Sequence, residues 1–198
     1  MRSAWFAAFA FCLAASVGAA APPQTEAAPQ DDVDPALSRA SELDQLYQRL
    51  AASSDDAETA ALAQKIDRLH LQTDSPTGEL LMTRAIAAMQ SANFEVSAAL
   101  LDAVIKSQPL WAEAWNKRAT LRYMAGDPQG SMADIAQTLK LEPRHYGALS
   151  GMGMILEQAG MREEALKAYE RTLALAPQMG AAKQAAERLK AAIAGQSL

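Results

Sequence analysis

The side chains that could do chemistry are few and scattered along the chain. His70 and His145 are the only histidines, and they stand 75 residues apart. Neither has a second histidine one helical turn away with a glutamate between them, which is the spacing of helical zinc sites. Glu79, Glu113 and Glu157 are equally dispersed and do not indicate a titratable cluster. We therefore expect no catalytic residue, no metal site and no cofactor.

The single cysteine, Cys12, lies in an N-terminal segment with the layout of a secretory signal peptide. Arg2 precedes the apolar stretch 4–17, and a run of small residues follows it. We expect a signal peptide over residues 1–20, cleaved among those small residues, with retention as a membrane anchor as the alternative. Cleavage would send the protein to the periplasm of a bacterium, without cysteine and without stable insertion in the membrane.

Acidic side chains outnumber basic ones. The chain has 18 Lys and Arg against 23 Asp and Glu, a net charge of −5, and loss of Arg2 with the signal peptide would make it −6. Phosphate binding needs clustered positive charge, so neither nucleic acid nor an anionic membrane surface is an expected partner.

Residues 21–36 are rich in proline and polar residues, with Val33 as the only large apolar side chain. This composition predicts a disordered linker.

A 34-residue period is the strongest pattern in the sequence. It is marked by three prolines, each of which closes an apolar run with helical spacing: Pro109, Pro143 and Pro177. Proline lacks an amide and disfavours helix in the residue before it, so we expect helix ends at Gln108, Glu142 and Ala176. Helix starts are expected at Asp127, where Pro128 follows, and at Asn93.

Aligned on these prolines, residues 78–179 form three similar blocks: 78–111, 112–145 and 146–179. A small residue recurs where the two helices of a block would cross closely: Ala85, Ala119 and Gly153. The pattern resembles the tetratricopeptide repeat family, with the cleanest matches at Trp115, Gly153, Gly160, Ala165, Tyr169 and Pro177. Polar residues depart from the family pattern, because Arg84 and Arg118 stand where leucine is usual, and Ser97 and Ser131 where alanine is usual.

Helical patterns also flank the three blocks. Residues 37–77 contain two apolar stripes separated by Asp55, a candidate helix start, and they lack a closing proline. We interpret them as a degenerate N-terminal repeat. Residues 180–195 carry a further apolar stripe, which indicates a helix that caps the last repeat. The expected fold is an all-α tetratricopeptide solenoid of three repeats, with the degenerate repeat before it and the capping helix after it.

The resemblance also implies a binding groove, because the first helices of such repeats line a concave surface. Carried over position by position, the groove residues are Met82, Ile86, Met89, Asn116, Thr120, Tyr123, Met124, Ser150, Met154 and Glu157. Methionine is flexible and is common on surfaces that accept varied apolar partners, although at helical spacing it is more often core. The family's Lys, Asn and Arg clamp for a terminal carboxylate is missing, since Met82, Ile86 and Gly151 stand at its positions.

The function implied is that of a non-enzymatic scaffold or adaptor of the cell envelope, which holds a segment of another protein or a peptide in the groove. Two alternatives stay open. One is an accessory subunit of an envelope enzyme complex. The other is a self-assembling structural protein, in which Leu110, Trp111 or the C-terminal helix pairs two copies as a homo-oligomer. The sequence identifies no partner.

Overall fold

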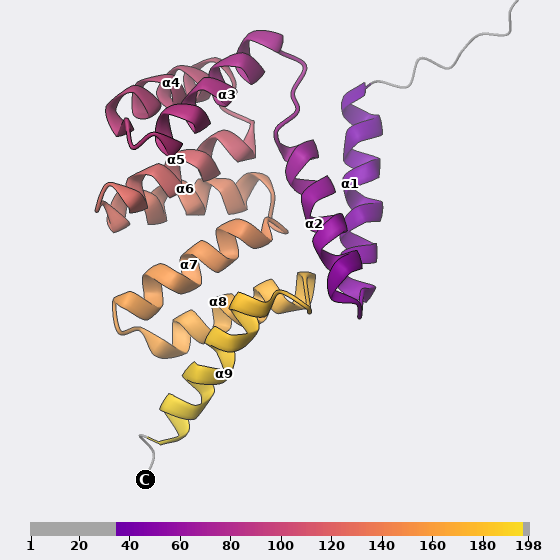
Figure 1. The fold of residues 1–198 in the computed structure, drawn as a ribbon, viewed down its shortest axis with the longest axis vertical. Coiled ribbons are helices and arrows are strands. Elements are labelled where there is room, and N and C mark those ends of the chain that lie inside the picture. The colour runs from indigo at the N-terminus through magenta and orange to yellow at the C-terminus, as the bar shows by residue number, and fades with distance from the viewer. Residues whose placement is uncertain (1–34, 196–198) are drawn as a thin grey trace, which may run out of the picture. The chain divides into compact units, whose positions relative to one another are not determined.

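The structure, a computed structural model, describes residues 35–195 of the 198-residue chain. Within that range every regular element is an α-helix (Figure 1). The helices are α1 (Pro35–Ala52), α2 (Asp56–His70), α3 (Pro76–Gln90), α4 (Phe94–Ser107), α5 (Ala112–Met124), α6 (Pro128–Leu141), α7 (Tyr146–Gln158), α8 (Arg162–Leu175) and α9 (Gly180–Ala194). None of these helices is long and apolar enough to cross a membrane. The expected signal peptide, Cys12 and nearly all of the expected linker lie outside the described residues.

Helices α3 to α8 form three pairs that stack on one another (Figure 1). The members of each pair pack most closely on each other, and successive pairs meet through α4 against α5 and α6 against α7. The turn inside each pair contains a residue with left-handed backbone: Ala92 at φ 55°, Gly126 at φ 81° and Gly160 at φ 77°. Glycine adopts this conformation without a steric penalty. The arrangement confirms the predicted all-α solenoid of helix pairs.

The helices of the repeats begin and end as the local sequence predicts. The C-terminal caps of α4, α6 and α8 are Gln108, Glu142 and Ala176. At the start of α6, the carboxylate of Asp127 accepts a hydrogen bond from the backbone N–H of Gly130 at 2.8 Å. Asn93 caps α4 and Asp55 caps α2 in the same way. Side-chain capping satisfies amides that a helix cannot pair internally, so these residues fix where each helix starts.

The crossing of α7 and α8 depends on the absence of a side chain at Gly153. A Cβ atom added there would lie 2.9 Å from Cε1 of Tyr169, closer than carbon atoms normally approach. Ala85 and Ala119, the corresponding residues of the other two pairs, are buried as well. The recurring small residue is therefore a requirement of close helix packing, as the alignment predicted.

Two of the polar residues that depart from the family pattern, Arg118 and Ser97, make hydrogen bonds in the interior. The guanidinium of Arg118 donates to both carboxylate oxygens of Asp134, at 2.9 and 2.8 Å, and to Asp102 at 2.6 Å. Asp134 is only 2% exposed and also contacts Arg122 at 3.0 Å. Ser97 is fully buried and donates its hydroxyl hydrogen to the carbonyl of Ala85 at 2.9 Å. These side chains replace apolar contacts by hydrogen bonds, which buried polar groups require.

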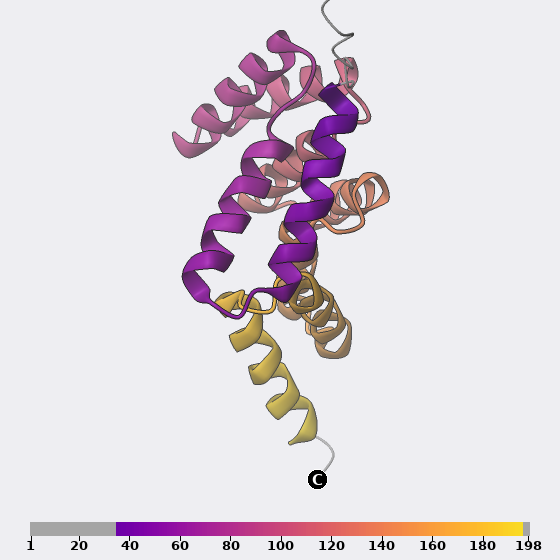
Figure 2. The same ribbon diagram turned by 90° about the vertical axis from the view of Figure 1, so that its right-hand side faces the viewer.

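The hairpin of α1 and α2 forms, but it does not extend the stack. Its apolar face consists of buried residues: Leu46, Tyr47, Leu50, Leu62, Ile66 and Leu69. This face packs on Tyr146, the first residue of α7, and on Ala176 at the end of α8. Figures 1 and 2 show both helices lying across the ends of the repeat helices, along the edge where one repeat connects to the next. The hairpin therefore braces the edge of the solenoid.

The last helix, α9, covers the outer side of the third pair. Its buried residues are Ala182, Ala185, Ala186 and Leu189, and they form one apolar cluster with Ala165 and Tyr169 of α8. Small side chains on α9 allow its backbone to approach α8 closely. The other face of α9 is exposed and polar, so this helix ends the stack as a cap should.

Candidate functional site

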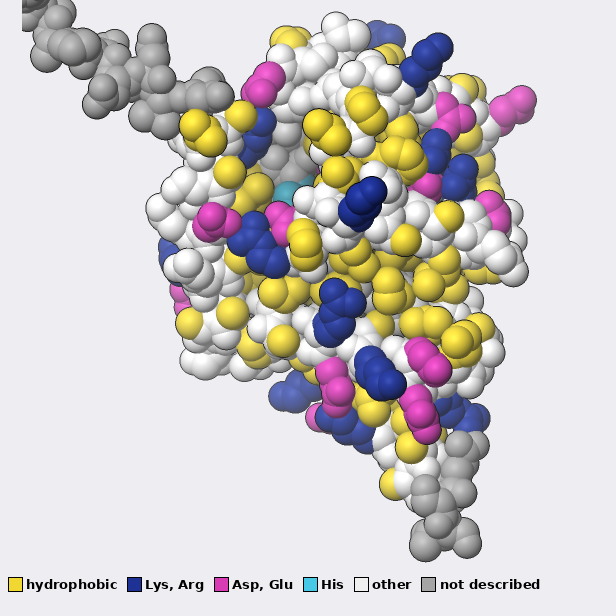
Figure 3. Space-filling view, turned by 180° about the vertical axis from the view of Figure 1, so that it is seen from behind, with side chains coloured by type: hydrophobic (Ala, Val, Ile, Leu, Met, Phe, Trp, Pro, Cys, Tyr) yellow, Lys and Arg dark blue, Asp and Glu magenta, His cyan; other side chains and the backbone are white. Residues whose placement is uncertain are grey.

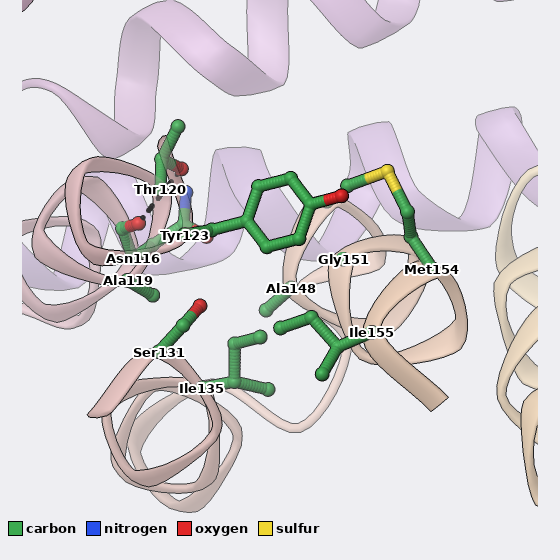
Figure 4. Close-up of a pocket in the computed structure, with 11 residues that line it drawn as sticks. Asn116, Ala119, Thr120, Tyr123, Ser131, Ile135, Ala148, Gly151, Met154 and Ile155 are labelled. Carbon is green, nitrogen blue, oxygen red and sulfur yellow. Dashed lines mark hydrogen bonds between the residues drawn. The ribbon is translucent and has the colours of Figure 1, made fainter. Parts of the chain in front are cut away.

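A small hollow opens between the second and third helix pairs, with a volume of about 70 Å³. Figure 4 shows side chains from α5, α6 and α7 converging on it. Four of the predicted groove residues line it: Asn116, Thr120, Tyr123 and Met154. The remaining lining is mostly apolar or small: Ala119, Ser131, Ile135, Gly147, Ala148, Gly151 and Ile155. The hollow therefore has an apolar floor with hydroxyl and amide groups around it.

Local hydrogen bonds hold the polar side chains of this hollow in place. Thr120 donates its hydroxyl hydrogen to the carbonyl of Asn116 at 3.0 Å, one turn earlier in α5. The side-chain amide of Asn116 donates to Glu113 at 3.3 Å. On the opposite side, the amide of Gln158 contacts the hydroxyl of Tyr123. The ring of Tyr123 consequently spans the hollow from α5 towards Met154 of α7 (Figure 4).

The other predicted groove residues differ in how much surface they present. Met124 and Met154 are 50% and 40% exposed, so both offer apolar surface to a partner. Ile86 and Ser150 are half-buried. Glu157 is held in the structure, since it accepts hydrogen bonds from Tyr169 at 3.2 Å and from Arg188 at 2.9 Å.

Two methionines assigned to the groove belong to the core instead. Met82 is 1% exposed and Met89 is 8% exposed, and both pack in a cluster with Leu101 and Val104 of α4. Their side chains fill the space between α3 and α4, where flexible methionine packs irregular gaps well. The prediction that they face a partner was wrong, because helical spacing alone does not separate the inner from the outer side of a helix pair.

A second cluster, which the sequence did not predict, is polar and lies at the junction of the hairpin with the repeats. It consists of His70, Glu113 and His145, whose ligand atoms all lie within 4.8 Å of one another. His70 ends α2, Glu113 lies in the first turn of α5, and His145 is the N-terminal cap of α7. The three residues thus come from the end of the hairpin, from the start of the second helix pair and from the loop directly before the third pair. We refer to these three residues as the junction cluster.

Hydrogen bonds define the state of His145 within the junction cluster. Its Nδ1 accepts from the backbone N–H of Ala148 at 3.2 Å, so the ring hydrogen lies on Nε2. Nε2 in turn donates to the carboxylate of Glu113 at 2.8 Å. The ring of His70 stacks on that of His145, with centroids 4.7 Å apart and planes inclined by 23°. His145 is only 4% exposed, so its ring is held in the interior.

Burial and neighbouring charges shift two pKa values in the junction cluster. Burial lowers the pKa of His70 to about 4, and the facing ring of His145 lowers it further in the same direction. Burial raises the pKa of Glu113, but hydrogen bonds from His145 and Lys117 outweigh this and bring it to about 2. Glu113 is therefore an ionised, buried carboxylate, and His70 is an uncharged imidazole at neutral pH.

Polar contacts surround the junction cluster and hold the hairpin to the repeats. The hydroxyl of Tyr146 donates to Asp67 of α2 at 2.8 Å. Arg144 contacts Asp44 of α1 at 2.6 Å, and its guanidinium lies 4.6 Å from the ring centroid of Tyr47. The Nε1–H of Trp111 donates to the carbonyl of His70 at 2.7 Å. Each contact joins a residue of the hairpin to a loop or helix start of the repeats.

The two residues predicted as candidates for self-assembly differ in how much of their surface is exposed. Trp111 is half-buried and contacts the hairpin, whereas Leu110 beside it is 81% exposed.

No spacing in the sequence could have predicted the junction cluster, because its members come together only when the hairpin docks. The one local signal was the position of His145 directly before an expected helix, which is a capping position.

Comparison with known proteins supports the assignment of the repeats. The family model of the tetratricopeptide repeat matches residues 146–179, which contain α7 and α8. A TPR repeat-containing protein of Rhizobium etli is 37% identical over 153 residues, which cover 77% of this chain and 75% of that protein.

Two solved structures share the fold at low sequence identity. The first TPR of Spaghetti (RPAP3), bound to the HSP90 peptide SRMEEVD, is 20% identical, with a TM-score of 0.58 over 62% of this chain and 97% of that one. The crystal structure of MamA is 16% identical, with a TM-score of 0.54 over 76% of this chain and 80% of that one.

Proposed function

This chain belongs to the tetratricopeptide repeat family, and on that basis we propose that it is a scaffold that binds a segment of another protein in the hollow between α5 and α7. The tetratricopeptide fold is in general a protein-interaction fold. The observation that carries the proposal is the hollow itself, in which four predicted groove residues meet. The partner is a peptide segment, as it is for the RPAP3 domain.

The chemistry of the hollow favours an apolar anchor residue in that segment. Its floor is formed by Ala119, Ile135, Ala148 and Ile155. A volume of about 70 Å³ admits one small apolar side chain, so neighbouring surface has to contribute the rest of the binding free energy. The exposed methionines of α5 and α7 extend the apolar surface on both sides. The amide and hydroxyl groups around the hollow can pair with the backbone of an extended segment.

A scaffold is favoured over an enzyme by what lines the hollow. Its lining residues include no carboxylate, imidazole, amine or thiol. General acid–base catalysis most often uses such groups, with pKa values shifted by their surroundings. The shifted pKa values belong to residues of the junction cluster, which does not line this hollow. We place the scaffold in the bacterial envelope, and the signal-peptide pattern of residues 1–20 supports this location.

Site-specific photocrosslinking in living cells tests the proposal. A crosslinking amino acid at Thr120 or Met154 should trap one defined partner, whereas the same amino acid at Ala133 should not. Ala133 is an exposed residue of α6 and lies opposite Ile135, which faces the hollow. Equal trapping from all three positions, or none from Thr120 and Met154, would rule out the hollow as the binding site.

A charge placed beside the hollow provides a second test. Met124 is half exposed, so Met124→Asp should leave the helix content and the unfolding temperature close to wild type. It should reduce trapping from Thr120, because an apolar partner would have to desolvate the new carboxylate. Normal trapping by a normally folded Met124→Asp protein would show that the partner binds elsewhere.

A further inference from the structure

The junction cluster has a donor set that its hydrogen bonds do not fully explain. Two imidazoles and one carboxylate lie within 4.8 Å of one another and come from three separate parts of the fold. Ser or Asn would cap α7 as well as His145 does, and a glutamine in place of Glu113 would accept the hydrogen bond from His145 without a buried charge. Nitrogen from histidine and oxygen from an ionised carboxylate are instead the ligands of a catalytic or structural zinc ion.

We propose that His70, Glu113 and His145 form a binding site for one divalent metal ion of the zinc class, which ties the α1–α2 hairpin to the second and third repeats. Mixed nitrogen and oxygen donors suit zinc, whereas Mg²⁺ and Ca²⁺ prefer sites built from oxygen alone. Three protein ligands leave the fourth tetrahedral position to a water molecule. The ion would hold the hairpin to the repeats. The proposal does not depend on which partner the hollow binds.

The electrostatics of the junction cluster suit a cation. Glu113 is 5% exposed and ionised, so its negative charge is buried. Its compensating cation is Lys117. The ammonium group of Lys117 lies 2.8 Å from Oε1 of Glu113, the carboxylate oxygen that does not contact His145, and its side chain is partly exposed. Lys117 can therefore move to solvent when an ion arrives, because its flexible side chain already reaches the surface.

Metal binding requires one ring of the stacked pair to turn. Rings 4.7 Å apart and inclined by only 23° cannot aim their in-plane lone pairs at one point. His70 is the ring that can turn, since it is held through one ring nitrogen by the hydroxyl of Tyr47 at 3.2 Å. His145 would bind through Nε2, and its ring hydrogen would move to Nδ1, so the cap on the amide of Ala148 would be lost. Both hydrogen bonds of the His145 ring, to the amide of Ala148 and to the carboxylate of Glu113, would be exchanged for the bonds that His145 and Glu113 make to the metal ion.

The junction cluster is also accessible from solvent. Histidine atoms reach the surface in a recess of the face shown in Figure 3, beside acidic and basic side chains. Of the two histidines, His70 is the more exposed, because His145 is buried. An ion can therefore reach the first ligand without unfolding of the repeats, and the turn of the His70 ring would then complete the site.

Equilibrium dialysis of the untagged full chain against ZnCl₂, after treatment with a chelator, tests the proposal. We expect one zinc ion per chain and no binding of Mg²⁺. Glu113→Gln and His70→Gln should weaken zinc binding by about 100-fold or more, because each removes a direct ligand. His145→Asn should do the same, and it keeps a side chain that caps α7, so circular dichroism should show an intact fold.

A matched control separates a specific site from general attraction to carboxylates. Glu157→Gln alters a carboxylate that belongs to a different ion pair, with Arg188, and it should bind zinc like the wild type. Zinc should also raise the unfolding temperature of the wild type and leave that of His70→Gln unchanged. Zinc binding that persists in His70→Gln and His145→Asn would overturn the proposal, as would a wild-type chain that retains less than one ion.

Discussion

The stacked repeats and the docked hairpin are both made of helix pairs, but different contacts hold them. In the third repeat, α7 and α8 meet where Gly153 leaves room for the ring of Tyr169, and the contact is one of shape. At the hairpin, an apolar face is framed by hydrogen bonds and ion pairs, among them that of Tyr146 with Asp67. Shape complementarity suffices at the crossing of α7 and α8, whereas the docked hairpin, which is distant in sequence, is held by polar contacts with defined partners.

The polar anchors have a physical role that apolar contacts cannot fulfil. An apolar helix face can slide along another apolar surface at little cost in free energy, but a buried hydrogen bond is satisfied in one position only. The contacts of Tyr146 with Asp67 and of Trp111 with the His70 carbonyl are partly buried and lie at different positions along α2. Together they fix the position of the hairpin along the edge of the solenoid.

The largest expected effect comes from breaking the shape-based contact. Gly153→Leu should lower the free energy of unfolding by about 4 kcal/mol, since even its Cβ would collide with the Tyr169 ring. Urea unfolding followed by circular dichroism measures this. Gly151→Ala, in the same helix, is the matched control, because its Cβ would lie 3.6 Å from Ile135, an ordinary contact. It should be neutral or stabilising, and equal losses from both changes would contradict the distinction.

Breaking the apolar face of the hairpin should have a smaller and more local effect. Leu50 is fully buried in the cluster that holds α1 and α2 to the repeats, so Leu50→Ala should cost about 3 kcal/mol. Hydrogen exchange should show faster exchange in α1 and α2 while protection in α5 to α8 is kept. If all helices lost protection together, the hairpin and the repeats would be one cooperative unit and the contrast between them would fail.

Removal of a single polar anchor should have a weaker effect again. Tyr146→Phe keeps the ring against the hairpin and deletes the hydroxyl that donates to Asp67 and to the carbonyl of Ala63. We expect a loss of about 1 kcal/mol, measured as a shift of the urea midpoint. Asp67→Asn, which retains an acceptor for the same hydroxyl, should lose less. A larger loss for Asp67→Asn would show that the charge and not the hydrogen bond matters.

The smallest effect is expected for an ion pair within the hairpin itself. Lys65 and Glu42 are 2.9 Å apart, and their side chains are 50% and 42% exposed. Lys65→Ala should change the free energy of unfolding by less than about 0.5 kcal/mol, because solvent screens exposed pairs. A thermal melt compared with that of Tyr146→Phe would show whether only contacts across the junction stabilise docking. A loss as large as that of Tyr146→Phe would remove this distinction.

Sequence predicted the repeats well because their rules are local. The helix ends at the residues before the repeat prolines and the small residue at each helix crossing depend on neighbours within one 34-residue unit. The place of the hairpin depends on contacts between residues such as Asp44 and Arg144, which no period relates. Residues 71–75 connect α2 to α3 without the closing proline of a repeat, and the chain turns away from the stack there.

The candidate hollow was predicted only in part, for a related reason. Asn116, Thr120, Tyr123 and Met154 were identified because they lie at groove positions of α5 and α7, the first helices of two adjacent repeats. Met82 lies in α3, the first helix of the first pair. Its side chain points towards α4 and is buried between the two helices. The junction cluster was missed altogether, since each of its residues has an ordinary local role as a helix end, a first-turn acid or a cap.

The contact between Asp44 and Arg144 joins residues that are 100 positions apart, and this has a consequence for the order of folding. During synthesis α1 and α2 are made before the surface that receives them. Tyr146 and Ala176 follow only with the third repeat, so the apolar face of the hairpin stays without its native cover until then. Closing such a long loop is entropically costly and slow compared with pairing of adjacent helices. The hairpin is therefore the first described part of the chain to be made, but its native contacts can form only after the third repeat has been made.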